Sequence, residues 1–186
     1  MRKMTATEKA FFDTIQFENF NGTKLISSKT LEIKAIAFAK QALKFKNEDA
    51  ISQSVHTLAK VFLYAQIIGN VSDELIDTFL TCMNTNDNNT VSEFVGYDIT
   101  EEGHLITGEE VQKMADIHRT VALRNIKVVD TEMKEFAKAI KKHPENFGIE
   151  FTQAEYKHAL KFINDFVNAM RKEINDNHKK VVAMVK

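Results

Sequence analysis

The sequence contains no tryptophan, one proline and one cysteine. A lone cysteine, Cys82, excludes an intramolecular disulfide framework and is typical of a reducing compartment. With Pro144 as the only proline, few helix breaks are enforced along the chain. No apolar run, such as that from Val61 to Ala65, approaches the length that spans a bilayer. These absences predict a cytoplasmic protein without membrane association.

Motifs for nucleotide binding and for catalysis are also missing. The six glycines are scattered, whereas phosphate-binding loops need them clustered. Cys82 lies among Phe79, Leu80 and Met83 in an acidic segment, and both burial and negative charge would raise the pKa of its thiol. His118 falls on an apolar helical stripe, which favours a core or boundary histidine. We therefore expect no enzyme activity, no catalytic residue and no cofactor.

Two Glu-x-x-His sequences have the spacing that places metal ligands on one face of a helix. One joins Glu155 to His158, and the other joins Glu101 to His104. Glu155 is also suited to cap its own helix, and the second pair is predicted to lie in a turn. No metal site is therefore predicted, and an unrecognised metal-dependent enzyme remains an alternative.

Positive charge is absent from the middle of the chain, because no Lys or Arg occurs between Lys60 and Lys113. Residues 1–60 carry ten basic side chains against six acidic ones, and residues 113–186 carry fifteen against ten. The middle segment holds ten carboxylates: Asp73, Glu74, Asp77, Asp87, Glu93, Asp98, Glu101, Glu102, Glu109 and Glu110. The near-neutral total therefore hides a strongly polarised charge distribution.

These carboxylates have two interpretations. They can face the chain's own basic helices and water, or they can form an acidic surface that imitates a row of phosphates and binds a basic groove. The second interpretation predicts a partner-binding acidic face made of Asp73, Glu74, Asp77, Asp98, Glu101 and Glu102.

Apolar spacing predicts helices in the first half of the chain. A capping box at Thr5 and Glu8 begins a short helix, and Asn21-Gly22 marks a turn within a small β-hairpin over 17–26. Further helices are expected from about Ser28 to Lys46, from Asn47 or Asp49 to Gly69-Asn70, and from Ser72 onwards. The Asn-rich residues 84–90 form a loop.

The second half predicts an antiparallel helical hairpin of residues 108–142 and 153–183, after a turn or second short hairpin around Glu101-Glu102-Gly103. Capping boxes at Thr107 and Thr152 begin the two helices, and a bend is placed near Asn125. The last helix carries a heptad seam that needs a partner helix: Tyr156, Leu160, Ile163, Val167, Met170 and Ile174. Pairing of this seam between two chains, giving a homodimer, is the competing outcome.

The predicted fold is all-α, with an N-terminal helical lobe (1–90), then an acidic connector and C-terminal hairpin (91–186), and it allows one small β-hairpin. The predicted function is non-enzymatic: an adaptor, regulator or inhibitor of a protein partner with a basic surface, consistent with a phage or bacterial accessory protein. The alternative is nucleic-acid binding. A loose helix-turn-helix pattern spans Ala65–Leu80. Its second helix is acidic and would be repelled by phosphates, which counts against nucleic-acid binding. A basic patch on the last helix supports it: Arg171, Lys172, Lys179 and Lys180.

Overall fold

The computed structural model describes residues 28–44, 48–84 and 107–185, and all the regular structure in these ranges is helical. The elements are α2 (Ser28–Lys44), α3 (Glu48–Ile68), α4 (Asp73–Asn84), α6 (Gly108–Lys142), a short 3-10 helix η2 (Pro144–Phe147) and α7 (Gln153–Met184). The predicted all-α class is confirmed for the described residues. None of the described helices has the length and apolar character needed to cross a membrane.

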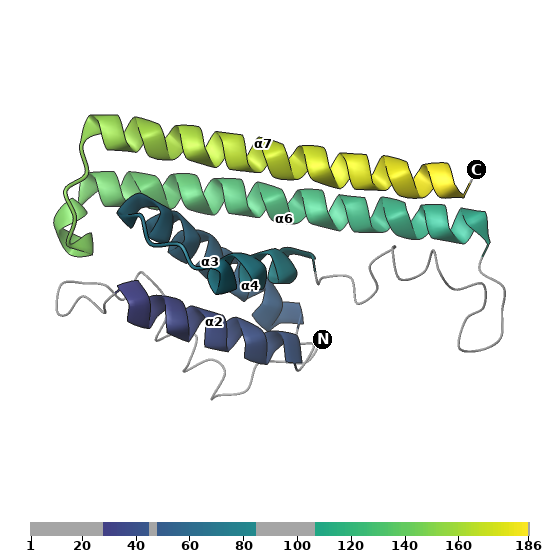
Figure 1. Ribbon diagram of the computed structural model, residues 1–186, viewed down its shortest axis with the longest axis horizontal. Helices are drawn as coiled ribbons and strands as arrows, with labels where there is room; N and C mark the ends of the chain where they lie inside the picture. The colour runs from purple at the N-terminus through teal and green to yellow at the C-terminus, as the bar shows by residue number, and fades with distance from the viewer. Residues whose placement is uncertain (1–27, 45–47, 85–106, 186) are drawn as a thin grey trace.

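Long helices α6 and α7 lie side by side and run in opposite directions (Figure 1). Capping boxes begin both, because Thr107 pairs with Glu110 and Thr152 pairs with Glu155 through reciprocal backbone and side-chain bonds. The rings of Phe151 and Tyr156 lie 6.4 Å apart and form the hydrophobic staple at the start of α7. The predicted bounds of both helices therefore agree with the structure to within one residue at every end.

The connection between α6 and α7 is short and turns through η2. Pro144 occupies the start of η2, where its missing N–H removes no helical hydrogen bond. Gly148 ends it with φ of 64°, a left-handed conformation that favours glycine. The Tyr64 hydroxyl of α3 donates a 2.8 Å hydrogen bond to the Phe147 carbonyl, so this turn is tied to the N-terminal helices.

Helices α3 and α4 pack on the hairpin, and α2 packs on α3 and α4, through one continuous apolar core. Aromatic rings mark the meeting point: Phe62 of α3 lies 5.5 Å from Phe79 of α4 and 5.3 Å from Phe166 of α7. On α6, the buried Asn125 donates a 2.8 Å hydrogen bond from Nδ2 to the Met83 carbonyl, satisfying one of the free carbonyls at the end of α4. Elements from both halves of the chain thus share their interior.

Burial of the α7 seam is uneven along the helix. Ile163 and Val167 are buried, whereas Tyr156, Leu160, Met170 and Ile174 are only partly buried. Beyond the end of α4 the hairpin has a small apolar cluster of its own around Val111 and Ala115. Two polar contacts also join the helices there: Arg119 Nε donates to Asn175 Oδ1 at 2.8 Å, and His178 Nε2 lies 2.6 Å from Asp116 Oδ1.

Several expectations fall on residues that the structure does not describe. These are the first helix with Phe11, Phe12 and Ile15, the β-hairpin over 17–26, most of the loop at 84–90 and the turn around Glu101-Glu102-Gly103. The expected boundary between residues 90 and 91 also lies outside the described ranges, so the division into two domains stays a prediction.

Candidate interaction surfaces

Three carboxylates project from one side of α4. Asp73, Glu74 and Asp77 are exposed, while Leu75 and Phe79 on the opposite side are buried in the core. Ser72 caps the helix, because its Oγ accepts a 3.1 Å hydrogen bond from the Leu75 N–H. Carboxylates in this first turn interact favourably with the positive end of the helix dipole. We call these three residues the acidic face of α4.

The acidic face is only partly neutralised by the chain itself. Lys40 Nζ of α2 lies 2.5 Å from Glu74 Oε1, with both side chains exposed. Asp73 and Asp77 make no ion pair with any residue in the described ranges. For these three residues the structure agrees with the first interpretation, because Glu74 faces a basic helix of the same chain and Asp73 and Asp77 face solvent. Binding of a partner by the acidic face stays a prediction.

The other three residues of the predicted acidic surface, Asp98, Glu101 and Glu102, lie outside the described residues. Their proximity to the acidic face of α4 stays a prediction.

The predicted basic patch lies on the C-terminal half of α7. Arg171 Nη2 is 3.9 Å from Asp130 Oδ2 of α6, and Lys179 Nζ is 3.7 Å from Asp176 Oδ1. Lys172 and Lys180 are exposed. At about 100° per residue the four positions span roughly half of the helix circumference. The four cations therefore do not share one narrow face, and two of them already have acidic neighbours.

Cys82 is fully buried on α4, and burial raises the pKa of its thiol to about 12. His118 is partly buried on α6, as expected for a boundary histidine. In the described residues, no group of three or more His, Cys, Asp or Glu side chains is arranged to hold a metal ion.

We expect Cys82 in the folded protein to resist a thiol reagent such as DTNB at pH 8. Its sulfur is inaccessible, and a thiol with a pKa near 12 is almost entirely protonated at that pH. Absorbance at 412 nm should rise quickly only after denaturant is added. A rapid stoichiometric reaction of the native protein would contradict the buried position.

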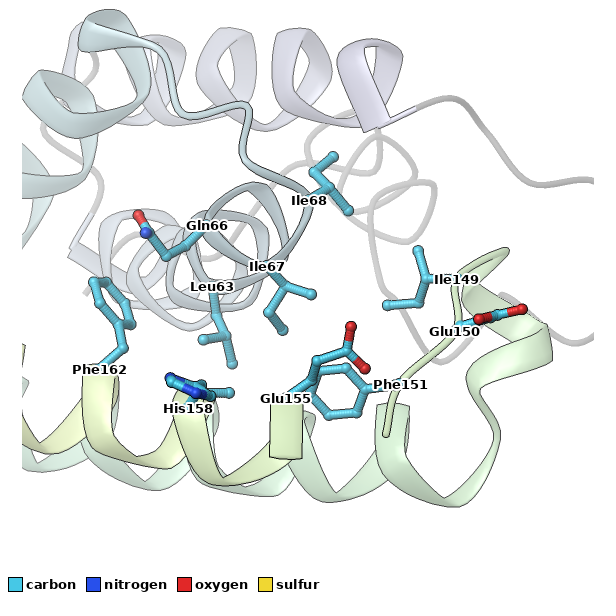
Figure 2. Close-up of a pocket in the computed structure, with 11 residues that line it drawn as sticks. Leu63, Gln66, Ile67, Ile68, Ile149, Glu150, Phe151, Glu155, His158 and Phe162 are labelled. Atoms are coloured by element: carbon cyan, nitrogen blue, oxygen red, sulfur yellow. The ribbon is translucent and has the colours of Figure 1, made fainter. Parts of the chain in front are cut away.

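An open groove of about 600 Å³ lies between the last turns of α3 and the first turns of α7 (Figure 2). Its sides come from three separate segments: the end of α3, residues 149–151, and the start of α7. Most of the lining is apolar: Leu63, Ile67, Ile68, Ile149, Phe151, Ala159 and Phe162. We call this feature the α3–α7 groove.

The polar groups of the α3–α7 groove are few. Gln66, Glu150, Glu155 and His158 complete its lining, and all four side chains are exposed. Glu155 accepts a 2.5 Å hydrogen bond from the Thr152 N–H, and this bond lowers the pKa of its carboxyl. The capping role predicted for Glu155 is confirmed, and this carboxylate and His158 both line the groove.

Sequence patterns locate only one side of this groove. The capping box at Thr152 and the staple of Phe151 fix where α7 begins, but nothing local indicates that the end of α3 lies opposite. Partly buried Ile67 and Ile68 next to the Gly69-Asn70 stop are a weak signal, because apolar residues in a last helical turn usually belong to the core.

Comparison with known proteins found no matching family model, no similar curated protein and no similar solved structure.

Proposed function

We propose that the protein is a non-enzymatic adaptor, regulator or inhibitor that binds the basic surface of a protein partner through the acidic face of α4. The observation that carries this proposal is the pair Asp73 and Asp77, one helical turn apart, exposed, and without a counter-ion in the described ranges. A basic groove that binds nucleic acid is a suitable partner surface, since carboxylates on a rigid helix can occupy phosphate positions.

Rigidity of this helix supports the proposal. Phe79 and Cys82 anchor α4 in the core, and Asn125 of α6 bonds to the backbone at its end. A fixed acidic face loses little conformational entropy on binding. The alternative surface on α7 has less support, because Arg171 and Lys179 already have acidic neighbours.

The double substitution Asp73→Lys and Asp77→Lys reverses two charges of the acidic face and should abolish binding of the partner. Nuclease-treated lysate of the native cell is passed over the immobilised wild type and the double variant, and bound proteins are eluted with a salt gradient. We expect a protein that the wild type retains and releases at moderate salt, and that the variant binds at least about tenfold more weakly, because each new lysine opposes a basic surface.

The matched control is Asp165→Lys with Glu173→Lys, which reverses two exposed carboxylates on α7 and changes net charge equally. This control should retain the partner. Equal retention by the α4 variant and the wild type, with unchanged circular dichroism, would refute the proposal.

A further inference from the structure

The geometry points to the α3–α7 groove as the docking site for an amphipathic helix of a partner protein, one with a row of apolar side chains flanked by Lys or Arg. This inference concerns a surface other than the acidic face of α4 and goes beyond the proposed function.

Apolar side chains dominate the groove and are not fully buried by the described residues. Ile67, Ile68, Ile149 and Phe162 are partly exposed around a volume of about 600 Å³ (Figure 2). Covering such a surface is favourable at about 25 cal/mol per Å² of apolar area removed from water. A wholly polar ligand would lose this contribution.

The dimensions of the groove suit a short helical segment. Along α7 it extends from Glu155 to Phe162, and along α3 from Leu63 to Ile68. The seven-residue step from Glu155 to Phe162 corresponds to a rise of about 10 Å, so the side of the groove formed by α7 is about two helical turns long. A docked helix would place apolar residues at i, i+3 or i+4, and i+7 against it.

The acidic side chains of the groove favour basic flanking residues on the docked helix. Among the residues that the structure describes, no Lys or Arg lines the groove, whereas the carboxylates of Glu150 and Glu155 do. The carboxylate of Glu155 lies between Ile67 and Phe151 in Figure 2. Its bond to the Thr152 N–H holds it in place and leaves other lone pairs free to accept from a cation.

Helix dipoles do not reverse this preference. The negative C-terminal end of the α3 dipole and the positive N-terminal end of the α7 dipole both border the groove, and each is equivalent to about half a charge. These two contributions oppose one another, and Glu155 lies in the first turn of α7. The two carboxylates therefore determine the sign of the site, and it favours a cation.

Two fluorescein-labelled helical peptides test the inference on the full chain. One has leucines at i, i+3, i+4 and i+7 with flanking lysines, and the other has glutamates in place of the lysines. Fluorescence anisotropy should show the lysine peptide binding at least about tenfold more tightly at low salt. Equal affinities, or no binding of the lysine peptide at about 1 mM, which corresponds to only about −4 kcal/mol, would overturn the inference.

Two substitutions locate the peptide. Gln66→Lys places a cation on an exposed lining position, and Glu155→Gln removes a charge while keeping a residue that serves in a capping box. Each should lower the affinity for the lysine peptide about three- to tenfold. Gln112→Lys, a substitution at an exposed position on α6, should leave this affinity unchanged. Unchanged affinity in both groove variants would refute the site.

Further measurements distinguish binding of a peptide in the groove from binding on the acidic face of α4 and from binding of a second copy of this chain. The variant with Asp73→Lys and Asp77→Lys should bind the lysine peptide as well as the wild type does. A loss in that variant alone would place the peptide on α4 and refute the groove. Sedimentation that shows a dimer dissociated by Gln66→Lys would identify a second copy as the occupant and also overturn the inference.

Discussion

Replacing Phe79 by alanine is expected to lower the free energy of unfolding by about 3–5 kcal/mol. Phe79 is 1% exposed, and its ring lies 5.5 Å from that of Phe62 and 6.2 Å from that of Phe166. These contacts join α4 to both α3 and α7. Alanine would leave a cavity that three separately anchored helices cannot easily close, and the loss is a large part of the total stability of a domain.

Urea denaturation followed by circular dichroism at 222 nm measures this effect. Because the core is shared, the wild type should unfold in one transition, and the variant should shift the whole of it. Ile33→Ala is the control, since this side chain is 58% exposed and its removal should cost no more than about 0.5 kcal/mol. Two transitions, with only one displaced by Phe79→Ala, would instead indicate separate N-terminal and C-terminal domains.

Helix bounds were the most predictable feature, because capping is local chemistry. Thr107 with Glu110 and Thr152 with Glu155 are each three residues apart, and that spacing alone fixes where α6 and α7 begin. The stop at Gly69 is equally local: its φ of 72° suits glycine. No neighbour distant in sequence is needed for any of these predictions.

Tertiary contacts were less predictable because they depend on which helices meet. The sequence predicts only a bend near Asn125, whereas in the structure its side chain bonds to the Met83 carbonyl, 42 residues earlier in the chain. The α3–α7 groove likewise requires that the end of α3 lies opposite the start of α7. Sequence periodicity gives the face of a helix that is apolar, but it does not give the neighbour of that face.

The uneven burial of the α7 seam also depends on which helices meet. A heptad pattern predicts six equivalent positions, but only Ile163 and Val167 are fully buried, in the core that α7 shares with α3, α4 and α6. Ile174 packs against the same core but is only partly buried. Positions that are equivalent in the heptad pattern therefore differ in burial, because the other helices of the core do not cover them equally.

Alanine substitutions at Ile163 and Ile174 test this difference within one helix. Ile163 is 0% exposed, so Ile163→Ala should cost about 2–5 kcal/mol through lost burial and a cavity. Ile174→Ala should cost about 1 kcal/mol, because its partly exposed site leaves no enclosed cavity. Urea denaturation at two protein concentrations measures both values. Equal costs, with a stability that rises with concentration, would mean that a second chain covers Ile174 and would favour the homodimer predicted through this seam.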